Sequence, residues 1–560
     1  MQLSPSAHLD TFCRDRLPSP DQWPELVLDL PATTYPDRLN AATELLDATI
    51  ARWGHDRPCV RDAGTGWTYG DLLDRAGRIA NVLTGLGVRP GNRVLLRGPN
   101  NAWLIACWFG VLKAGAVAVT TMPMLRTPEL EKIVSMCRPT VALTDHRFAA
   151  ELLAVHDAPT VVPYGGDTDD DLVARAARAS SSFADVETAA DDVALLAFTS
   201  GTTGLPKATM HFHRDVLAVA DTFSAHVLDP RPDDVFAGSP PLAFTFGLGG
   251  LLIFPLRAGA SVFLVERATP VELARLAAEH GVTMLFTAPT GYRAILGSPQ
   301  RELLRGLRRA VSAGEALPTT VADDFLAVTG RRMIDGIGGT EMLHVFISTG
   351  TDPAPAGTTG KPVPGYRATI LDADGRPVPD GTPGRLAVKG PTGCRYLNGD
   401  RQTQYVYDGW NVTGDVFVRD AEGYYYFRGR TDDMIVSSGY NIAGPEVEDV
   451  LMQHPDVAEC AVVGAPDEAR GAAVAAYVVL RTGVEPGPGT VRELQEFAKR
   501  TAAPYKCPRQ VEFVDALPRT PSGKIERYVL RRWAAERAGA QAPTTATATS
   551  RTAIGENPVA

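Results

Sequence analysis

The chain has 560 residues, of which 44% are hydrophobic and 21% are charged, and its formal net charge is −10. This composition predicts a globular protein of several domains, and an acidic balance without a Lys/Arg run argues against nucleic acid as a partner. The sequence has no long apolar run and no basic start followed by an apolar segment, so we expect no membrane partner, no signal peptide and a cytoplasmic protein.

The cysteines and two neighbouring histidines bear on metal and disulfide chemistry. The seven cysteines are scattered without a CxxC pair, which predicts reduced, mostly buried thiols. His211 and His213 are two residues apart, which invites a metal site, but no Cys lies near them in the sequence to complete one. We therefore expect neither a disulfide framework nor a structural zinc site.

Up to about residue 430, short β-branched runs alternate with Ala/Leu-rich helical patterns. The first half of the chain shows this well, with strands expected at 92–97 and 116–120 and helices at 103–113 and 270–280. Alternation of this kind predicts an α/β fold with layered, mostly parallel sheets and helices.

Two changes of pattern divide the chain further. Gly/Pro-punctuated segments indicate a smaller β subdomain, and after residue 430 a helix at 445–451 and strands at 459–463 and 472–480 indicate a small α+β domain. The end of the chain lacks apolar periodicity, which predicts disorder. The expected divisions are an N-terminal domain at 1–429 with its β subdomain at about 349–428, a C-terminal domain at 430–537 and a disordered tail at 538–560.

The most informative segment is L-A-F-T-S-G-T-T-G-L-P-K at 196–207, which overlaps an apolar run at 193–198 expected to form a buried strand. Glycines let backbone N–H groups close around an anion, while hydroxyls and a lysine add donors and charge. The lysine spacing differs from the GxxxxGK[ST] pattern of P-loop enzymes. The segment predicts a phosphate-binding loop made of Thr199, Ser200, Gly201, Thr202, Thr203, Gly204 and Lys207.

A second motif, D-G-I-G-G-T-E at 335–341, follows a strand-like stretch at 332–334. A carboxylate beside a hydroxyl on a Gly-rich turn can hold Mg2+ through Glu341 and contact an α-phosphate through Thr340. The run W-N-V-T-G-D ends in Asp415, a carboxylate that can accept both hydroxyls of a ribose. Other short motifs are S-A-G-E-A at 312–316, G-R-T-D-D at 429–433, S-S-G-Y at 437–440 and T-P-S-G-K at 520–524.

Taken in their order along the chain, these motifs resemble those of the adenylate-forming superfamily. This superfamily includes acyl- and aryl-CoA ligases, nonribosomal-peptide adenylation domains and firefly-type luciferases. The resemblance covers nearly the whole chain apart from its two ends. It implies that a carboxylate and ATP form an acyl-adenylate and pyrophosphate, and that a thiol then takes the acyl group. The implied cofactors are ATP, Mg2+ and CoA.

The resemblance also implies roles for individual residues. Lys524 would bridge the carboxylate and the α-phosphate during adenylation, acting with Thr340, Glu341 and Lys207. Asp432 corresponds to the hinge about which the small domain swings. The implied nucleotide-binding residues are Gly314, Glu315, Ala316, Asp335, Gly336, Ile337, Asp415 and Arg430, with Ile337 where relatives have an aromatic residue, and the implied CoA-binding residues are Ser437, Ser438, Gly439 and Tyr440.

The runs P-P-L-A-F-T-F-G-L-G-G at 240–250 and E-M-L-H-V-F at 341–346 resemble those of benzoate- and 2-aminobenzoate-CoA ligases. In such a slot Phe246 offers a face to a flat ring, Gly338 leaves room, and His344 can hydrogen-bond a ring substituent. The alternative, favoured by periodicity alone, is that the phenylalanines are core aromatics. The implied acid-binding residues are Phe244, Thr245, Phe246, Gly338, His344 and Val345.

The resemblance therefore implies an aryl-CoA ligase acting on 2-aminobenzoate, a related ortho-substituted benzoate or benzoate. An enzyme that loads the phosphopantetheine thiol of a separate carrier protein is the alternative, because both kinds of acceptor present the same arm. A non-catalytic sensor of ATP or an aromatic acid is disfavoured, since Lys524, Glu341 and the 199–207 loop are intact. We expect a monomer or a homodimer.

Overall fold

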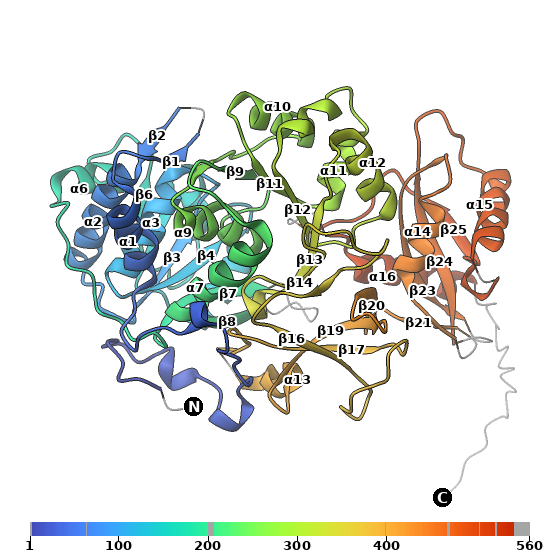
Figure 1. The fold of residues 1–560 in the computed structure, drawn as a ribbon, viewed down its shortest axis with the longest axis horizontal. Helices are drawn as coiled ribbons and strands as arrows, with labels where there is room; N and C mark the ends of the chain where they lie inside the picture. Colours follow the sequence, from blue (N-terminus) through green and yellow to red (C-terminus); the bar gives the residue numbers. More distant parts are fainter. Residues whose placement is uncertain are drawn as a thin grey trace, which may run out of the picture. The chain divides into compact units, whose positions relative to one another are not determined.

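The computed structural model describes residues 3–62, 64–199, 206–397, 399–431, 433–437, 440–467, 471–502, 504–520 and 524–541. The chain divides into two compact units, Met1–Thr431 and Asp432–Ala560, so the division falls beside the boundary expected at 429/430. Among the described residues, the strands of the larger unit form three β-sheets and those of the smaller unit form one (Figure 1).

The first sheet has the strand order β6-β5-β3-β4-β7-β8 and is parallel except for the last pair. Alternate residues of its strands pack on two sides: Leu95 and Val119 face the cluster that contains α4, whereas Val94 and Ala118 face the cluster that contains α2 and α3. Helices cover both faces, as parallel sheets require. The strands are β3 (Arg93–Arg97), β4 (Val117–Thr121), β5 (Val141–Asp145), β6 (Thr160–Tyr164), β7 (Val193–Thr199) and β8 (Lys207–Phe212). The helices are α2 (Tyr69–Gly85), α3 (Ala102–Lys113), α4 (Thr127–Cys137), η5 (His146–Phe148), α5 (Ala149–Leu153), α6 (Leu172–Arg178) and α7 (His213–Val219).

The second sheet has the order β15-β14-β13-β12-β11-β9-β10-β1-β2, with a parallel centre and antiparallel edges. One core cluster joins Ala237, Leu285 and Ala310 of its strands to residues of α10, α11 and α12, which Figure 1 shows beside them. The strands are β1 (Pro58–Arg61), β2 (Gly66–Thr68), β9 (Val235–Gly238), β10 (Ser261–Phe263), β11 (Met284–Thr287), β12 (Arg309–Ala313), β13 (Ile334–Gly338), β14 (Val345–Ser348) and β15 (Lys361–Pro362). The helices are η4 (Thr43–Asp47), α1 (Ala48–Trp53), η6 (Ala220–Leu228), α8 (Thr245–Leu248), η7 (Gly249–Ile253), α9 (Phe254–Ala258), α10 (Pro270–Glu279), α11 (Pro289–Leu296), η8 (Arg301–Gly306), α12 (Thr319–Thr329) and η9 (Thr340–Met342).

The third sheet is antiparallel and lies in the region expected to be a β subdomain. That region is not all one sheet, because β15 pairs with β14 and so extends the second sheet. The strands are β16 (Arg367–Leu371), β17 (Gly384–Lys389), β18 (Val406–Tyr407), β19 (Trp410–Arg419) and β20 (Tyr425–Arg430), and the short helices are η10 (Gly399–Arg401) and α13 (Gln402–Tyr405).

The smaller unit is an α+β module whose sheet has the order β22-β21-β24-β23, with β25 paired to β24. Its last helix corrects the predicted start of a disordered tail at residue 538, because α16 continues to Gln541. The two alanines of the A-G-A-Q run favour a helix, although the glycine between them does not. The elements are β21 (Ile435–Ser437), β22 (Tyr440–Ile442), α14 (Gly444–Leu451), β23 (Val457–Asp467), β24 (Gly471–Leu480), α15 (Pro488–Thr501), η11 (Pro504–Lys506), β25 (Gln510–Phe513) and α16 (Arg527–Gln541).

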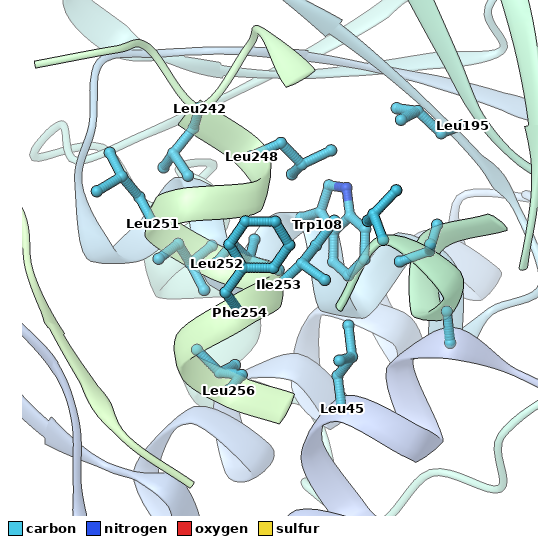
Figure 2. Close-up of a cluster of buried hydrophobic side chains, with 14 of the residues drawn as sticks. Leu45, Trp108, Leu195, Leu242, Leu248, Leu251, Leu252, Ile253, Phe254 and Leu256 are labelled. Carbon is cyan, nitrogen blue, oxygen red and sulfur yellow. The ribbon is translucent and has the colours of Figure 1, made fainter. Parts of the chain in front are cut away.

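The largest core cluster of the larger unit joins α3 to the continuous helical stretch α8–η7–α9. Figure 2 shows Leu248, Ile253 and Phe254 of this stretch gathered around Trp108 of α3. All residues of α3 except Trp103 are buried, as expected for a helix that is apolar on every side.

The segment before the first long helix is extended and includes η1 (Arg14–Arg16), η2 (Pro20–Gln22) and η3 (Pro31–Thr33). It packs along the larger unit, where the Glu25 N–H donates to the Gly409 carbonyl at 2.8 Å and the Val27 N–H donates to the Gly390 carbonyl at 2.9 Å. This segment thereby ties the third sheet to the rest of the unit.

All seven cysteines are free and buried, which confirms the prediction of reduced thiols. No described helix combines the length and the apolar character needed to cross a bilayer. Burial raises the pKa of the Cys13 and Cys137 thiols to about 12, so these thiols stay protonated and inert.

Candidate active site

The predicted phosphate-binding loop connects β7 and β8. Thr199 and Lys207 are cross-strand partners at the ends of these two strands, and β7 is buried along most of its length. The other predicted loop residues, Ser200, Gly201, Thr202, Thr203 and Gly204, lie outside the described residues. In the described part of the chain no carboxylate pairs with Lys207, whose Nζ lies 5.6 Å from the ring centroid of Tyr396.

Six of the residues predicted to bind the nucleotide lie on or directly after two adjacent parallel strands, β12 and β13. Ala313, the last residue of β12, pairs with Gly336 of β13, so the segment that follows β12 lies beside β13. Gly314 begins that segment with a φ of +93°, a conformation that favours glycine. In sheets of this kind ligands bind at the carboxyl edge of the strands. Gly314, Glu315 and Ala316 follow the last residue of β12, and Asp335, Gly336 and Ile337 belong to β13, where Gly336 pairs with that last residue.

The strand that carries Asp335 begins later and runs further than predicted. The sequence indicated a strand at 332–334 followed by a turn, whereas β13 spans Ile334–Gly338. Gly336 and Gly338 lie within this strand, and glycine is needed at both positions because the neighbouring β14 and the residue before it leave no room for a side chain. A Cβ on Gly336 would lie 2.6 Å from Cγ1 of Val345, and one on Gly338 would lie 2.6 Å from the His344 carbonyl oxygen.

Asp335 is a buried carboxyl group opposite Ser312 of β12. Its Oδ1 has no hydrogen-bond partner among the described residues. Burial raises the pKa of Asp335 to about 7, which the Gly336 N–H and the Ser312 hydroxyl only partly offset. This unpaired acceptor at the edge of the sheet is suited to a donor on a ligand, such as an exocyclic amino group.

The raised pKa predicts a pH-dependent effect of Asp335→Asn. The folded-state pKa exceeds the ordinary value near 4, so the protonated carboxyl group contributes to the free energy of unfolding. This contribution is fully present below about pH 4 and is lost as the pH rises through 7. Asn cannot ionise, so the stability gain of the variant should grow from pH 4 to pH 7, by a few kcal/mol in total, and level off above pH 7. Urea unfolding from pH 5 to pH 8 measures it.

Asp323→Asn, at an exposed position of α12, is the matched control and should show no such trend. A stability difference between Asp335→Asn and the unmodified enzyme that stays constant from pH 5 to pH 8 would contradict the prediction.

The Thr340–Glu341 turn is held from two sides. The His211 Nε2–H donates to the Thr340 carbonyl at 2.8 Å, and the Tyr396 hydroxyl donates to Glu341 Oε1 at 2.7 Å. The turn ends at Leu343, a buried residue with a φ of +69°, which is a strained conformation for a leucine. Contacts on both sides thus fix this turn in an unfavourable backbone geometry.

Two tyrosines link Glu341 to the predicted ribose-binding residues. Burial and the charge of Glu341 raise the pKa of Tyr396, so its hydroxyl stays a donor. Burial and the charges of Glu341 and Asp415 likewise raise the pKa of Tyr405, whose ring meets that of Tyr396 edge to face at 6.0 Å. Asp415 and Arg430 are cross-strand partners on β19 and β20 and form an ion pair of 3.2 Å. These contacts bring Glu341, Asp415 and Arg430 into one region.

Glu341 fits a role in holding Mg2+. Its only hydrogen bond within the described residues is the one from Tyr396, and no cluster of three acidic, His or Cys side chains is found there. Mg2+ is commonly held by one or two carboxylates together with substrate phosphates, without a full protein cage. A single carboxylate, linked through Tyr396 to Lys207 of the predicted phosphate-binding loop, matches this pattern.

Aromatic side chains enclose His344, the residue predicted to contact a ring substituent. Its ring lies 4.6 Å from that of Phe254, 5.3 Å from that of Phe223 and 5.7 Å from that of Phe246. Burial lowers the pKa of His344 to about 3, which the nearby Phe246 backbone only partly offsets, so the imidazole is neutral. Neither ring nitrogen makes a hydrogen bond of good geometry within the described residues. A Cβ on Gly249 would lie 2.4 Å from His344 Cδ2, so this position needs glycine.

The other predicted acid-binding residues differ in exposure. Phe244, Thr245 and Phe246 are half-buried at the start of α8, and Gly338 is exposed, whereas Val345 is a core residue. A small apolar cavity lies near α8, but none of the six predicted residues lines it. Its walls are Leu96, Leu104, Trp108, Thr120, Thr121, Leu242, Ala243, Leu248 and Leu252.

A buried ion pair lies beside this site and was not predicted. Arg395 and Asp215 are fully buried and joined at 2.8 Å, and the guanidinium also lies 4.0 Å from the ring centroid of Phe212. His211 Nδ1 lies 4.0 Å from Asp215, and burial lowers the pKa of His211 to about 4. His213, its neighbour in the sequence, accepts the Ala41 N–H at 3.0 Å. Both histidines therefore contact the backbone.

The remaining predicted residues belong to the smaller unit. Lys524 is exposed, and its N–H donates to the Thr520 hydroxyl at 3.1 Å, while its carbonyl accepts the Thr520 N–H at 2.8 Å. Ser437 ends β21 and pairs with Tyr440 of β22. Ser438, Gly439 and the predicted hinge residue Asp432 lie outside the described residues.

Family models match both units of the chain. The model described as AMP-binding enzyme matches residues 46–396, and the model described as AMP-binding enzyme C-terminal domain matches residues 446–524. The chain belongs to the AMP-binding enzyme family. The resemblance to adenylate-forming enzymes is thereby confirmed, as are the expected α/β fold class and an enzyme of the AMP-forming acid–thiol ligase type.

Individual relatives of this AMP-binding enzyme act on aromatic acids. This chain is 36% identical to a benzoate–CoA ligase of Thauera aromatica, and the match covers 90% of this chain and 97% of the relative. The structure of the anthranilate CoA ligase AuaEII with anthranoyl-AMP matches with a TM-score of 0.86 and 33% identity, over 91% of this chain and 100% of that one. A benzoate CoA ligase from Burkholderia xenovorans matches with a TM-score of 0.81 and 32% identity, over 88% and 100% of the two chains.

Proposed function

We propose that this enzyme is an ATP-dependent aryl-CoA ligase. It activates an aromatic carboxylic acid as the acyl-adenylate, releases pyrophosphate and transfers the acyl group to CoA. The observation that carries the proposal is the neutral His344 enclosed by three phenylalanine rings, in a chain similar over most of its length to benzoate- and anthranilate-CoA ligases.

The described residues support a division of roles in the first half-reaction. Lys207 provides positive charge for the phosphates of ATP, Thr340 contacts the α-phosphate, and Asp415 accepts the ribose hydroxyls. Mg2+ held by Glu341 would supply positive charge that offsets the charge of the phosphates. Lys524 adds a cation for the adenylation step.

We propose 2-aminobenzoate, or another ortho-substituted benzoate, as the acid. A neutral imidazole has one acceptor and one donor nitrogen, so His344 can accept from an amino group or pair with a hydroxyl group on the ring. Neither nitrogen makes a hydrogen bond of good geometry within the described residues, and a buried polar atom without such a partner is costly. Binding a ring with a polar ortho substituent would remove that cost.

Pyrophosphate release measured across an acid panel tests this assignment. We expect the largest kcat/KM for 2-aminobenzoate or salicylate, with benzoate lower by about one order of magnitude, the value of one lost hydrogen bond to a buried group. Phenylacetate and octanoate should be poor substrates. A preference for octanoate would reject the aromatic slot.

The same panel with free CoA tests the acceptor. An aryl-CoA ligase should convert the acid to its CoA thioester in step with pyrophosphate release. An enzyme that loads a carrier protein should release pyrophosphate but form little aryl-CoA, and that result would replace CoA by a carrier's phosphopantetheine arm in the proposal.

A further inference from the structure

Tyr396 has no role in the proposed chemistry, yet its hydroxyl contacts the side chain proposed to hold Mg2+. The hydroxyl donates to Glu341 Oε1 at 2.7 Å, and the tyrosine is 3% exposed. We propose that Tyr396 is a positioning residue for Glu341, which fixes the carboxylate so that Oε2 is presented to the magnesium ion that accompanies ATP. This inference rests on the proposed function of the site.

Tyr396 is itself rigidly placed. Its N–H donates to the Gln402 side-chain oxygen at 3.0 Å, and it forms a bridge to Thr209 of β8. The neighbouring bonds, from the Leu397 N–H to the Ala208 carbonyl at 2.9 Å and from the Met210 N–H to the Arg395 carbonyl at 2.7 Å, attach this segment to β8. The backbone of Tyr396 is therefore attached to the strand that begins at Lys207.

The surroundings of the second carboxylate oxygen leave room for a ligand. A Cβ built on Gly339 would lie 3.5 Å from Glu341 Oε2 and 3.9 Å from the Tyr405 hydroxyl, and within the described residues no other atom beyond its two chain neighbours comes within 4 Å. Oε1 is engaged by Tyr396, so Oε2 is the oxygen that borders this open side. Mg2+ demands near-octahedral geometry, and hydrogen bonds to the second oxygen of a ligating carboxylate commonly set its orientation.

Metal binding to the Tyr396→Phe enzyme tests the inference directly. The full-length enzyme, saturated with a non-hydrolysable ATP analogue, is titrated with Mn2+ while free Mn2+ is followed by electron paramagnetic resonance. We expect the Kd for Mn2+ to rise on the order of tenfold, the usual effect of losing such a partner. Binding of the analogue without metal should be unchanged. An unchanged Mn2+ Kd would overturn the inference.

Kinetics provide a second readout. In ATP–pyrophosphate exchange, Tyr396→Phe should raise the Mg2+ concentration that gives half the maximal rate, while saturating Mg2+ should restore most of that rate. The KM for the aromatic acid should not change. A lower maximal rate that excess Mg2+ does not restore would indicate a structural role only and would overturn the inference.

Tyr292→Phe is the matched control, because Tyr292 is fully buried and its hydroxyl donates to the Leu285 carbonyl at 2.7 Å, away from Glu341. The Tyr292→Phe enzyme should lose about as much stability as the Tyr396→Phe enzyme, but its Kd for Mn2+ should not change. In a Glu341→Gln background, Tyr396→Phe should have no further effect on that Kd, and a full additional effect would contradict the inference. If no acid yields AMP, the proposed function fails, whereas the Mn2+ titration still decides the role of Tyr396.

Discussion

Lys524→Ala lowers the rate of pyrophosphate release on the order of 10²- to 10³-fold, the range found when one preorganised charge-stabilising group is removed. Thioester formation from supplied aryl-adenylate and CoA should change by less than threefold. The reason is that negative charge grows on the phosphorus centre only in the first half-reaction, so a cation used there stabilises only that transition state. Lys524 is exposed, so folding should not be affected.

Lys499→Ala is the control for the Lys524 prediction. Lys499 is an exposed lysine of α15 in the same unit, where it pairs with Glu496 at 2.7 Å. Its loss removes the same charge from the unit without changing either half-reaction. Equal losses of both half-reactions in Lys524→Ala would show that the lysine is not specific to adenylation.

Arg395→Met destabilises the larger unit by about 3–5 kcal/mol, the usual cost of leaving one charge of a buried pair without its partner. Asp215 is fully buried, and although Arg214 Nε lies 4.0 Å from its Oδ1, that oxygen accepts no hydrogen bond within the described residues. The guanidinium also packs on Phe212, and methionine preserves part of that contact. Urea unfolding followed by tryptophan fluorescence measures the loss, since Trp23 lies 5.4 Å from Arg395.

Two further variants separate charge from packing. Arg275→Met removes an exposed ion pair to Glu279 on α10 and should cost about 1 kcal/mol or less. Adding Asp215→Asn to Arg395→Met should recover part of the stability, because the buried charge is then gone. If the double variant were less stable than the single one, packing and not the unpaired charge would explain the loss.

The sequence predicts those features that depend on local pattern. The apolar run before the glycine-rich loop is β7, and the apolar residues between β3 and β4 form α3, because strand and helix periodicities are readable over a few residues. The glycines around Asp335 predict a turn, because glycines usually mark turns. In β13 they serve the close approach of β14, which no local pattern reveals.

Contacts between distant residues could not be predicted from this one sequence. His211 and Thr340 are 129 positions apart, and Tyr396 and Glu341 are 55 positions apart. Nothing in the local sequence indicates such partners, because the sheet order β4-β7-β8 and the attachment of residues 395–397 to β8 bring them together. Arg395 and Tyr396 are consecutive in the sequence, and two consecutive polar residues show no periodicity that would distinguish them from surface residues.

The left-handed backbone at Leu343 has a consequence for how the enzyme meets its ligands. A strained residue of this kind costs folding free energy, on the order of 1–3 kcal/mol, that must be met by the rest of the structure. Contacts from His211 and Tyr396 hold this turn, so in the proposed function Glu341 and His344 would be in place before nucleotide or acid binds. Association then carries little entropic penalty for arranging this corner, and an insertion or deletion between Thr340 and His344 would disturb both sites at once.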